Sequence, residues 1–588
     1  MSQPLVLPTG SPHLGPAERV HALAGLQANE LDILIIGGGV VGCGAALDAA
    51  SRGLRVGLIE QRDWAAGTSS RSSRLAHGGL RYLEQFEFGL VREALTERGL
   101  LLERLAPHLV RPVPFVFPLS KSWERPYVGA GVALYDALSR VGGYTDRLKG
   151  HKHLSQDAVL DLVPALRRDA VAGGVGFFDA QIDDVRHTLA LARQAAAFGA
   201  HVVTRVEATV LTRGVDGRVT GAELADLESG RQLSVRARVV IGSVGVWSDR
   251  LRALLHGDGA PPAPVRPSKG VHLIVPKSAI DSRSAIIART EQSVLFLLPW
   301  GSHWIIGTTD TPWDGDRAEP EATEADVEYL LEQANNWLVR PISWDDIVGV
   351  YAGLRPLIAG SSAHAAPGTD SAAASAPTED TTKLSREHAV SRSAPGLVTI
   401  AGGKYTTYRV MARDVVDAAV ADLAPREGAF AASAVPASAT ENIPCAGGAD
   451  YRAALDQVAW TAADAGLPEL TVRRLLTRHG DLVAPVLELI AADRALAVPL
   501  HPESKYLRAE IVHAATHEGA LHLEDVLARR TRLALMTRDG GSSVAKEAAE
   551  LMGAVLGWDG TTAAAEVAAF EEYLSHTRGV LQRHVARR

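Results

Sequence analysis

Cysteine is scarce in this chain: only Cys43 and Cys445 occur among 588 residues, far apart in the sequence. Two distant cysteines provide neither a disulfide framework nor the spacing of a zinc site, so we expect no metal centre. Long apolar runs are also missing, and the first thirty residues, with four prolines, contain no signal-peptide core. We therefore expect a cytoplasmic protein without a membrane span, which leaves attachment to a membrane surface open.

The chain also lacks a strong excess of one charge. Its formal net charge is -8, its charged residues make up 22% and its hydrophobic residues 46% of the sequence. These values are ordinary for a folded globular protein and predict no nucleic-acid partner. A chain of 588 residues is too long for one core, so about two or three domains are expected.

The stretch "LDILIIGGGVVGCGAALDAASRGLRVGLIE", residues 31–60, has the pattern of a strand, a glycine turn, a helix and a second strand. Gly37 permits the tight turn, Gly39 lets the backbone approach a pyrophosphate, and Gly42 lets the helix pack closely. Glu60 ends the second strand, where it can accept hydrogen bonds from both ribose hydroxyls. The pattern predicts a dinucleotide site and leaves FAD and NAD both open. Cys43 is expected to be a small buried helix residue.

Further strands are expected in "HVVTRVEATVLTR" and "ARVVIGSVG", and two strands joined by a Gly301-Ser302 turn in "SVLFLLPWGSHWIIGTTD". The stripe of Met411, Val415, Ala419 and Leu423 predicts a helix that closes the α/β part. Residues 361–380 are rich in Ala, Ser and Pro and predict a flexible surface loop. A linker over 431–449 precedes residues 450–588, in which helical patterns separated by Gly and Pro predict an all-α domain.

Five ordered motifs carry a family resemblance: "GTSSRSSRLAHGGLRYLE", "SKGVHLIVP", "LLPWGSHWIIGTTD", "YAGLRPL" and "AGGKYTTYR". From about residue 32 to residue 423 the chain closely resembles the FAD-dependent, quinone-linked glycerol-3-phosphate dehydrogenases. One turn departs from that pattern: residues 242–249 read "GSVGVWSD", although Gly245 and Trp247 are retained.

The resemblance implies an FAD-binding fold of the glutathione-reductase and amino-acid-oxidase type, with an antiparallel-sheet substrate domain and an all-α C-terminal domain. The FAD-binding segments would be about 31–115, 180–265 and 345–430, interleaved with substrate-domain segments 116–179 and 266–344, after an N-terminal extension 1–30. Besides the glycine turn and Glu60, the implied cofactor-binding residues are Thr68, Ser69, Ser70, Ser73, Gly78, Gly79, Val206, Gly245, Trp247, Gly402, Gly403, Lys404 and Thr406.

The implied substrate is sn-glycerol 3-phosphate, which would be oxidised to dihydroxyacetone phosphate. Arg81, Arg355 and Lys404 are the cations expected to hold the phosphate, because charge-assisted hydrogen bonds suit a dianion. Tyr82 is a further candidate for substrate binding, with a packed tyrosine as the equal alternative. For the proton acceptor we expect His77 first, acting together with Arg355, and His272 second, because a neutral imidazole can accept the hydroxyl proton.

The implied electron acceptor is a membrane quinone. Residues 121–153 combine Trp123, Tyr127, Tyr135 and Tyr144 with six Lys and Arg, a composition that suits either a membrane-surface segment or an ordinary surface helix. The resemblance therefore carries the expectation of peripheral membrane attachment, and a homodimer is a further expectation. An oxidase that passes electrons to oxygen stays open as the alternative. A flavin-binding scaffold without turnover would predict damaged substrate motifs, and a NAD-linked enzyme would predict a second dinucleotide fingerprint.

Overall fold

The structure is a computed structural model, which describes residues 8, 10–79, 87–121, 123–141, 150–256, 265–290, 294–358, 387–423 and 434–587. Its first sheet contains the predicted βαβ unit: β1 (Leu31–Ile36), α2 (Val40–Ser51) and β2 (Val56–Glu60). The sheet order is β17-β18-β10-β1-β2-β7, and β1 runs parallel to both of its neighbours. The other strands of this order are β7 (His201–Thr204), β10 (Gln232–Gly242), β17 (His388–Ala394) and β18 (Leu397–Gly402). A hairpin of β8 (Val206–Arg213) and β9 (Val219–Asp226) pairs with β10.

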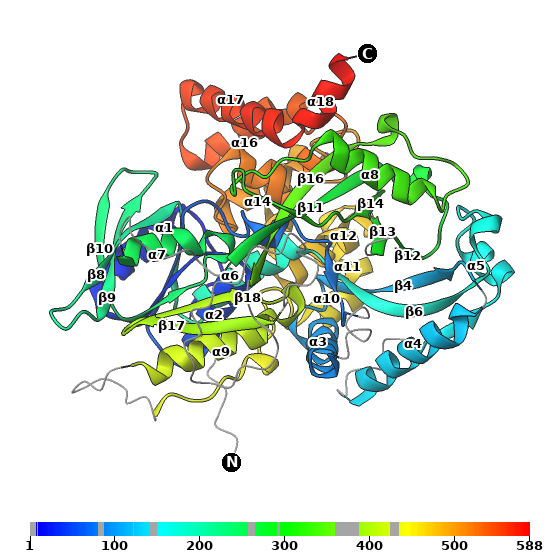
Figure 1. Cartoon of the computed structure of the whole chain (residues 1–588). Helices are drawn as coiled ribbons and strands as arrows, with labels where there is room; N and C mark the ends of the chain where they lie inside the picture. The colour runs from blue at the N-terminus through cyan, green and yellow to red at the C-terminus, as the bar shows by residue number, and fades with distance from the viewer. Residues whose placement is uncertain are drawn as a thin grey trace.

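The second sheet has the order β15-β11-β14-β13-β12-β4-β6-β3, with β16 on β11 and β5 on β6 (Figure 1). Its strands are β3 (Leu75–Ala76), β4 (Val110–Leu119), β5 (Lys152–Leu154), β6 (Gly173–Ile182), β11 (Val265–Pro276), β12 (Ala285–Arg289), β13 (Val294–Trp300), β14 (His303–Gly307), β15 (Thr311–Pro312) and β16 (Gly349–Ile358). The predicted hairpin around Gly301 is confirmed, since β13 and β14 are antiparallel.

The sheet pairing differs from two of the segment boundaries that we expected from the sequence. β16 pairs with β11 along ten residues, although the sequence placed 345–430 in the FAD-binding part, and β4 crosses the boundary at 115/116. Ladders decide which sheet a strand joins, and the apolar pattern of a single strand does not reveal its partner.

Helices α6 (Asp184–Ala197) and α9 (Tyr408–Ala421) pack against α2. The predicted stripe on α9 is confirmed: Met411, Val415 and Ala419 are buried in the core that also contains β1 and α2, as is Cys43. Within the described part of the predicted linker, 434–449, the stretch 443–448 is largely buried. Cys445 and Ala446 are buried, and their backbone N–H groups donate to Leu105 and Ala190. Residues 361–380 lie outside the described residues.

The remaining helices before the C-terminal domain are α1 (Pro16–Ala28), α3 (Phe88–Leu100), α4 (Glu124–Val141), α5 (Gln156–Leu162), α7 (Ser248–His256) and α8 (Glu324–Asn335). The C-terminal domain consists of α10 (Tyr451–Asp456), α11 (Val458–Ala465), α12 (Glu469–His479), α13 (Ala484–Ala492), α14 (Arg508–His517), a π-helical turn (Asp525–Arg530), α15 (Leu533–Met536), α16 (Ala545–Leu556), α17 (Gly560–Thr577) and α18 (Gly579–Ala586). Among the helices that the structure describes, none is long and apolar enough to cross a membrane.

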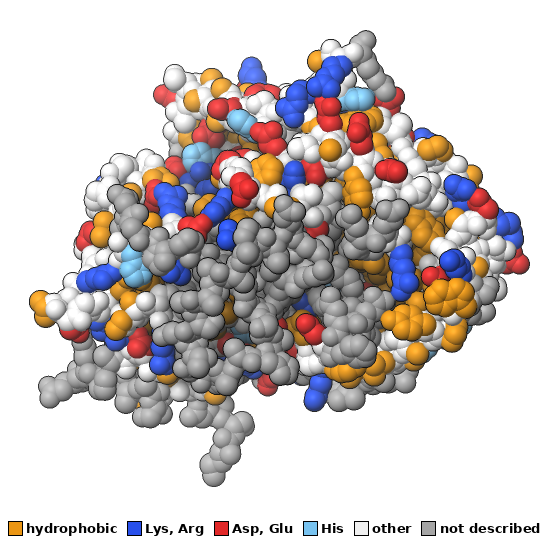
Figure 2. Space-filling model, in the orientation of Figure 1, with side chains coloured by type: hydrophobic (Ala, Val, Ile, Leu, Met, Phe, Trp, Pro, Cys, Tyr) orange, Lys and Arg blue, Asp and Glu red, His pale blue; other side chains and the backbone are white. Residues whose placement is uncertain are grey.

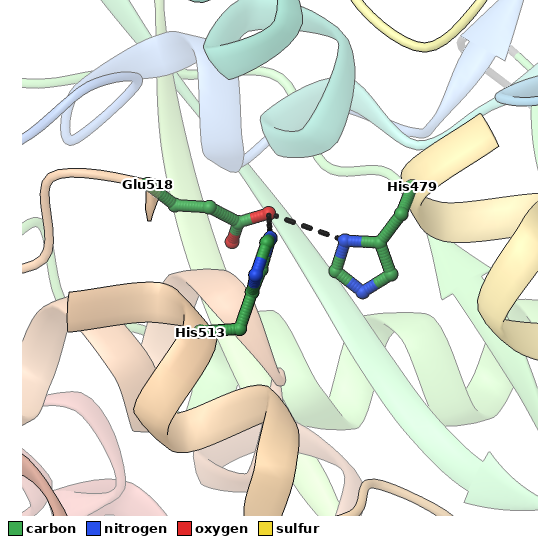
Figure 3. Close-up of side chains that lie close together, drawn as sticks. All are labelled: His479, His513 and Glu518. Carbon is green, nitrogen blue, oxygen red and sulfur yellow. Dashed lines mark ion pairs between the residues drawn. The ribbon is translucent and has the colours of Figure 1, made fainter. Parts of the chain in front are cut away.

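A buried polar junction joins the C-terminal domain to α6. Glu518 lies between the imidazoles of His479 and His513, whose nearest nitrogens are 3.4 Å and 3.5 Å from its Oε1 (Figure 3). The ligand atoms of these three residues lie within 4.8 Å of one another, a spacing that a cation site would also have. Arg186 of α6 donates to Glu518 Oε2 at 2.6 Å and to His479 Nδ1 at 3.2 Å. Because the Arg186 guanidinium already donates to Glu518 Oε2 and His479 Nδ1, we interpret the cluster as an ion-paired junction.

The junction makes the fold sensitive to acid. Burial lowers the pKa of His513 to about 3, against an ordinary value of 6.5. The unfolded chain therefore takes up a proton as the pH falls below 6.5, whereas the folded chain resists it until about pH 3. The contribution of His513 to stability is therefore complete above pH 6.5 and is lost below it, by about 1.4 kcal/mol per pH unit until about pH 3.

We expect the thermal midpoint to fall between pH 6.5 and pH 4, and less steeply in His513→Gln, measured by differential scanning fluorimetry. His576→Gln is the control, because His576 lies exposed on α17. Equal slopes in the wild type and His513→Gln would contradict this origin of the acid sensitivity.

Candidate functional site

A cavity of 1010 Å³ is lined by residues of both sheets and of α4. At one end lies the turn between β1 and α2. Gly37 has φ +111°, and a Cβ there would lie 2.6 Å from the Ser243 carbonyl oxygen. A Cβ on Gly42 would lie 1.9 Å from the Gly37 oxygen, so the helix packs against the turn only with glycine at this position. Gly37 and Gly39 line the cavity, and Gly42 lies behind them.

Glu60 lines the same end of the cavity. Its carboxylate accepts hydrogen bonds from the backbone N–H groups of Gly38 at 2.7 Å and Arg62 at 2.8 Å. Burial raises the pKa of the Glu60 carboxyl, and these two donors oppose that shift. The strand end thus holds a carboxylate beside the glycine turn, as a ribose site requires.

The hydroxyls of residues 68–73 point in different directions. Thr68, Ser69 and Ser73 line the cavity. The Thr68 hydroxyl donates to the Leu354 carbonyl at 2.7 Å, and Ser69 Oγ accepts from the Val40 N–H at 3.0 Å. Ser70 is absent from the described cavity wall, because its hydroxyl turns back to the Gly67 carbonyl at 3.2 Å.

The two glycines after His77 also differ. Gly79 lines the cavity, whereas Gly78 packs against α3 and α4, where a Cβ would lie 2.3 Å from Leu95 and 2.6 Å from the Tyr135 hydroxyl. The sequence could not distinguish them because both glycines satisfy the same pattern.

The remaining predicted cofactor residues also line the cavity: Val206, Gly245, Trp247, Gly402, Gly403, Lys404 and Thr406. Gly245, Gly402 and Gly403 have φ of +52°, +75° and +79°, so the departing 242–249 turn still bends at its glycine. Taken with the glycine turn and Glu60, this long cavity fits an adenosine diphosphate half at one end and a flavin ring at the other.

The predicted catalytic residues come from three elements that are distant in sequence. His77, His272 and Arg355 line the same cavity. The segment around His77 is tied to the 402–406 turn, because Thr406 Oγ1 contacts the His77 backbone N–H at 3.2 Å and its carbonyl at 3.3 Å. Lys404 of that turn also lines the cavity. Arg81 and Tyr82 lie outside the described residues.

His272, on β11, is held by two neighbours. Its Nε2 lies 2.8 Å from Ser73 Oγ, and its ring stacks on Tyr351 with centroids 4.7 Å apart. Burial, together with the nearby Arg355, lowers the pKa of His272 to about 3. A neutral ring with so low a pKa takes up a proton weakly.

Arg355, on β16, is fixed by the chain around it. Its Nη2 donates to Thr308 Oγ1 and to the Thr309 carbonyl, both at 3.1 Å, and Nη1 lies 3.5 Å from Asp310. Gly270, paired with Gly353 on the facing strand, leaves room for it, because a Cβ at Gly270 would lie 2.5 Å from Nη2.

Sequence reasoning missed two parts of the site. Ser72 and Tyr351 support the 67–74 turn, as the Tyr351 hydroxyl donates to the Ser72 carbonyl at 2.9 Å. The cavity also continues into an apolar lobe, lined by Phe115, Phe117, Val128, Val132, Phe177, Val294 and Phe296. β4, with the sequence "VRPVPFVFPL", was not among the strands predicted from the sequence, and nothing in its pattern shows that one face lines a cavity.

Comparison with known proteins agrees with this geometry. Residues 32–409 match the family of FAD dependent oxidoreductases, and residues 438–563 match the C-terminal domain of alpha-glycerophosphate oxidase. The chain is 48% identical over 574 residues to glycerol-3-phosphate dehydrogenase 2 of Mycobacterium tuberculosis, covering 97% of this chain and 93% of the relative. It is 34% identical over 564 residues to the human mitochondrial glycerol-3-phosphate dehydrogenase, covering 92% and 73%.

Among solved structures, the glycerol-3-phosphate dehydrogenase of Bacillus halodurans complexed with FAD aligns with a TM-score of 0.73 at 27% identity, covering 96% of this chain and 98% of that one. The predicted fold class and the predicted cofactor, FAD, are therefore confirmed. The chain belongs to the FAD-dependent glycerol-3-phosphate dehydrogenase family.

Proposed function

We propose that this protein oxidises sn-glycerol 3-phosphate to dihydroxyacetone phosphate and passes the electrons to a membrane quinone. One observation carries the proposal: the cavity with the glycine turn and Glu60 at one end also contains His77, Arg355 and Lys404. The relatives' names give the substrate class. When bound, FAD supplies the acceptor for the hydride of the substrate's second carbon.

The cations of the cavity are proposed to hold and orient the phosphate. Arg355 offers a planar fork that matches phosphate oxygens, and its contacts with Thr308 and Thr309 fix the direction of that fork. Lys404, in the turn between β18 and α9, adds a second positive charge to the cavity wall. Such contacts form in both the ground state and the transition state, so their loss should appear mainly in KM.

The hydroxyl proton of the substrate is proposed to pass to His77. A base must lie within reach of the hydroxyl and have a pKa near the working pH, and burial takes His272 far below that range. His272 would then keep Ser73 oriented through their 2.8 Å contact.

Anaerobic reduction tests the substrate assignment. The flavin absorption of the purified yellow protein near 450 nm should bleach when sn-glycerol 3-phosphate is added. It should not bleach with glycerol, which lacks the phosphate. An unchanged spectrum with sn-glycerol 3-phosphate would contradict the proposed function.

Gly270→Ala tests the role of Arg355 without removing its charge. The new Cβ would displace the guanidinium, so KM for glycerol 3-phosphate should rise about tenfold with a smaller change in kcat. Gly560→Ala, at a position with open space, is the matched control. A KM equal to that of the control would show that Arg355 does not hold the substrate.

His77→Ala tests the base. Turnover should fall by about a hundredfold or more, the usual contribution of a general base, while KM changes little. His272→Asn should cost less, because its ring is proposed to orient Ser73 and not to take the proton. Unchanged turnover in His77→Ala would remove His77 from the mechanism.

The apolar lobe and the outer face of α4 favour a quinone over oxygen as the acceptor. An aromatic-lined lobe is larger than oxygen needs, and Val128 and Val132 of α4 form part of its wall. Beside them Trp123 is 67% and Tyr127 60% exposed. Figure 2 shows apolar side chains gathered where Figure 1 draws α4. Tyr127 also lines the cavity, and an exposed aromatic patch that reaches the cavity suits a bilayer surface.

Trp123→Ser should weaken binding to anionic lipid vesicles in a flotation assay and slow turnover with a vesicle-embedded quinone, leaving turnover with a soluble dye acceptor unchanged. Trp460→Ser is the matched control, since Trp460 is also 67% exposed but lies on α11. Equal vesicle binding by both variants would contradict the membrane face. Faster reoxidation by oxygen than by quinone, with peroxide formed, would indicate the oxidase.

A further inference from the structure

Three arginines near the end of the π-helical turn reach from the C-terminal domain into the cofactor site. Arg529, Arg530 and Arg532 are at most 3% exposed, so their charges are buried between the two parts of the chain. Arg532 has φ +61°, a conformation that residues other than glycine rarely adopt. Surrounding contacts must hold such a residue in place, which makes its partners informative.

The first two arginines, Arg529 and Arg530, bind the loop that follows Glu60. Asp63 is fully buried, and its carboxylate accepts from Arg529 Nε at 2.5 Å and from Arg530 Nη1 and Nη2 at 2.6 Å and 2.8 Å. The loop that leaves the predicted ribose site is therefore fixed by the C-terminal domain.

The third arginine reaches the serine-rich turn beside the cavity. Arg532 Nη1 donates to the Ser70 carbonyl at 2.9 Å, and Nη2 pairs with the fully buried Asp184. The other oxygen of Asp184 accepts from the Ser72 hydroxyl at 2.7 Å and from its backbone N–H at 3.3 Å. The hydroxyl and the backbone N–H of Ser72 are thus both held by the carboxylate that pairs with Arg532.

What Ser72 fixes is the residue that follows it. Ser73 points into the cavity, where its hydroxyl lies 2.8 Å from His272 Nε2, and Tyr351 binds the Ser72 carbonyl while stacking on His272. A shift of the turn would disturb the contact of Ser73 with His272 and that of Ser72 with Tyr351.

We infer that the C-terminal helical domain positions the cofactor site: Arg532 is a positioning residue that holds, through Asp184 and Ser72, the turn presenting Ser73 to the cavity. The inference rests on the proposed function only in taking this cavity as the place where FAD and substrate meet. Release of FAD from the holoenzyme can be measured without substrate.

The test compares FAD release from diluted holoenzymes, followed by the recovery of flavin fluorescence well below the thermal midpoint. Arg532→Lys keeps a charge beside Asp184 but cannot also reach the Ser70 carbonyl in the same geometry. We expect release about tenfold faster than from wild type, with a changed flavin absorption band. Arg474→Lys is the control, because it makes the same change in an arginine that pairs with Glu510 inside the C-terminal domain.

Ser72→Ala reaches the same link from the other side and removes a single hydroxyl, so it guards against a folding defect in Arg532→Lys. It should also speed release, and the effect of the double variant should be smaller than the two single effects combined, because both changes loosen the same turn. Release rates and flavin spectra equal to those of Arg474→Lys, or fully additive effects, would overturn the inference. A protein that binds FAD as predicted but is not reduced by glycerol 3-phosphate would instead refute the proposed function alone.

Discussion

The cofactor site depends on two carboxylates that are buried between the first sheet and the C-terminal helices. Asp63 and Asp184 are fully buried and are paired with arginines that lie more than 340 residues later in the chain. A carboxylate that is buried without a partner is unfavourable, and breaking a buried pair typically costs about 3–5 kcal/mol, a large part of the net stability of a folded protein. The loops around the cavity can therefore hold their shape only when the C-terminal domain is docked.

This constraint explains the arrangement of the site. Gly37 and Gly42 bring the α2 N-terminus against β1, and Asp63 secures the loop that follows β2. Asp184, at the start of α6, secures the turn that presents Ser73. The cavity is lined by the glycine turn, by His77 and Arg355, and by the aromatic lobe to which α4 contributes. In the proposed reaction a polar end receives the phosphorylated alcohol, and an apolar end leads the electrons to a quinone.

Local patterns predicted the elements well and their assembly less well. The βαβ unit, the hairpin at Gly301 and the α9 stripe each follow from spacing within one segment. The choice of sheet for β16 does not, because a strand's partner is set by packing elsewhere in the chain.

The same limit applies to the site. Glycines and hydroxyls in one motif could be listed but not oriented, so Ser70 and Gly78 turn away from the cavity while Ser72, which no pattern singled out, supports its wall. The roles of Asp63, Asp184 and Arg532 could not be predicted, since each requires a partner from a distant segment.

Hydrogen exchange of the FAD-bound protein, followed by mass spectrometry at rising urea concentrations, tests most directly whether the cofactor loops and the C-terminal domain form one unit. The account predicts that amides of residues 63–74 and 525–533 lose protection at the same urea concentration, together with release of FAD. If residues 525–533 open at lower urea while residues 63–74 stay protected and FAD stays bound, the buried arginine pairs do not hold the site.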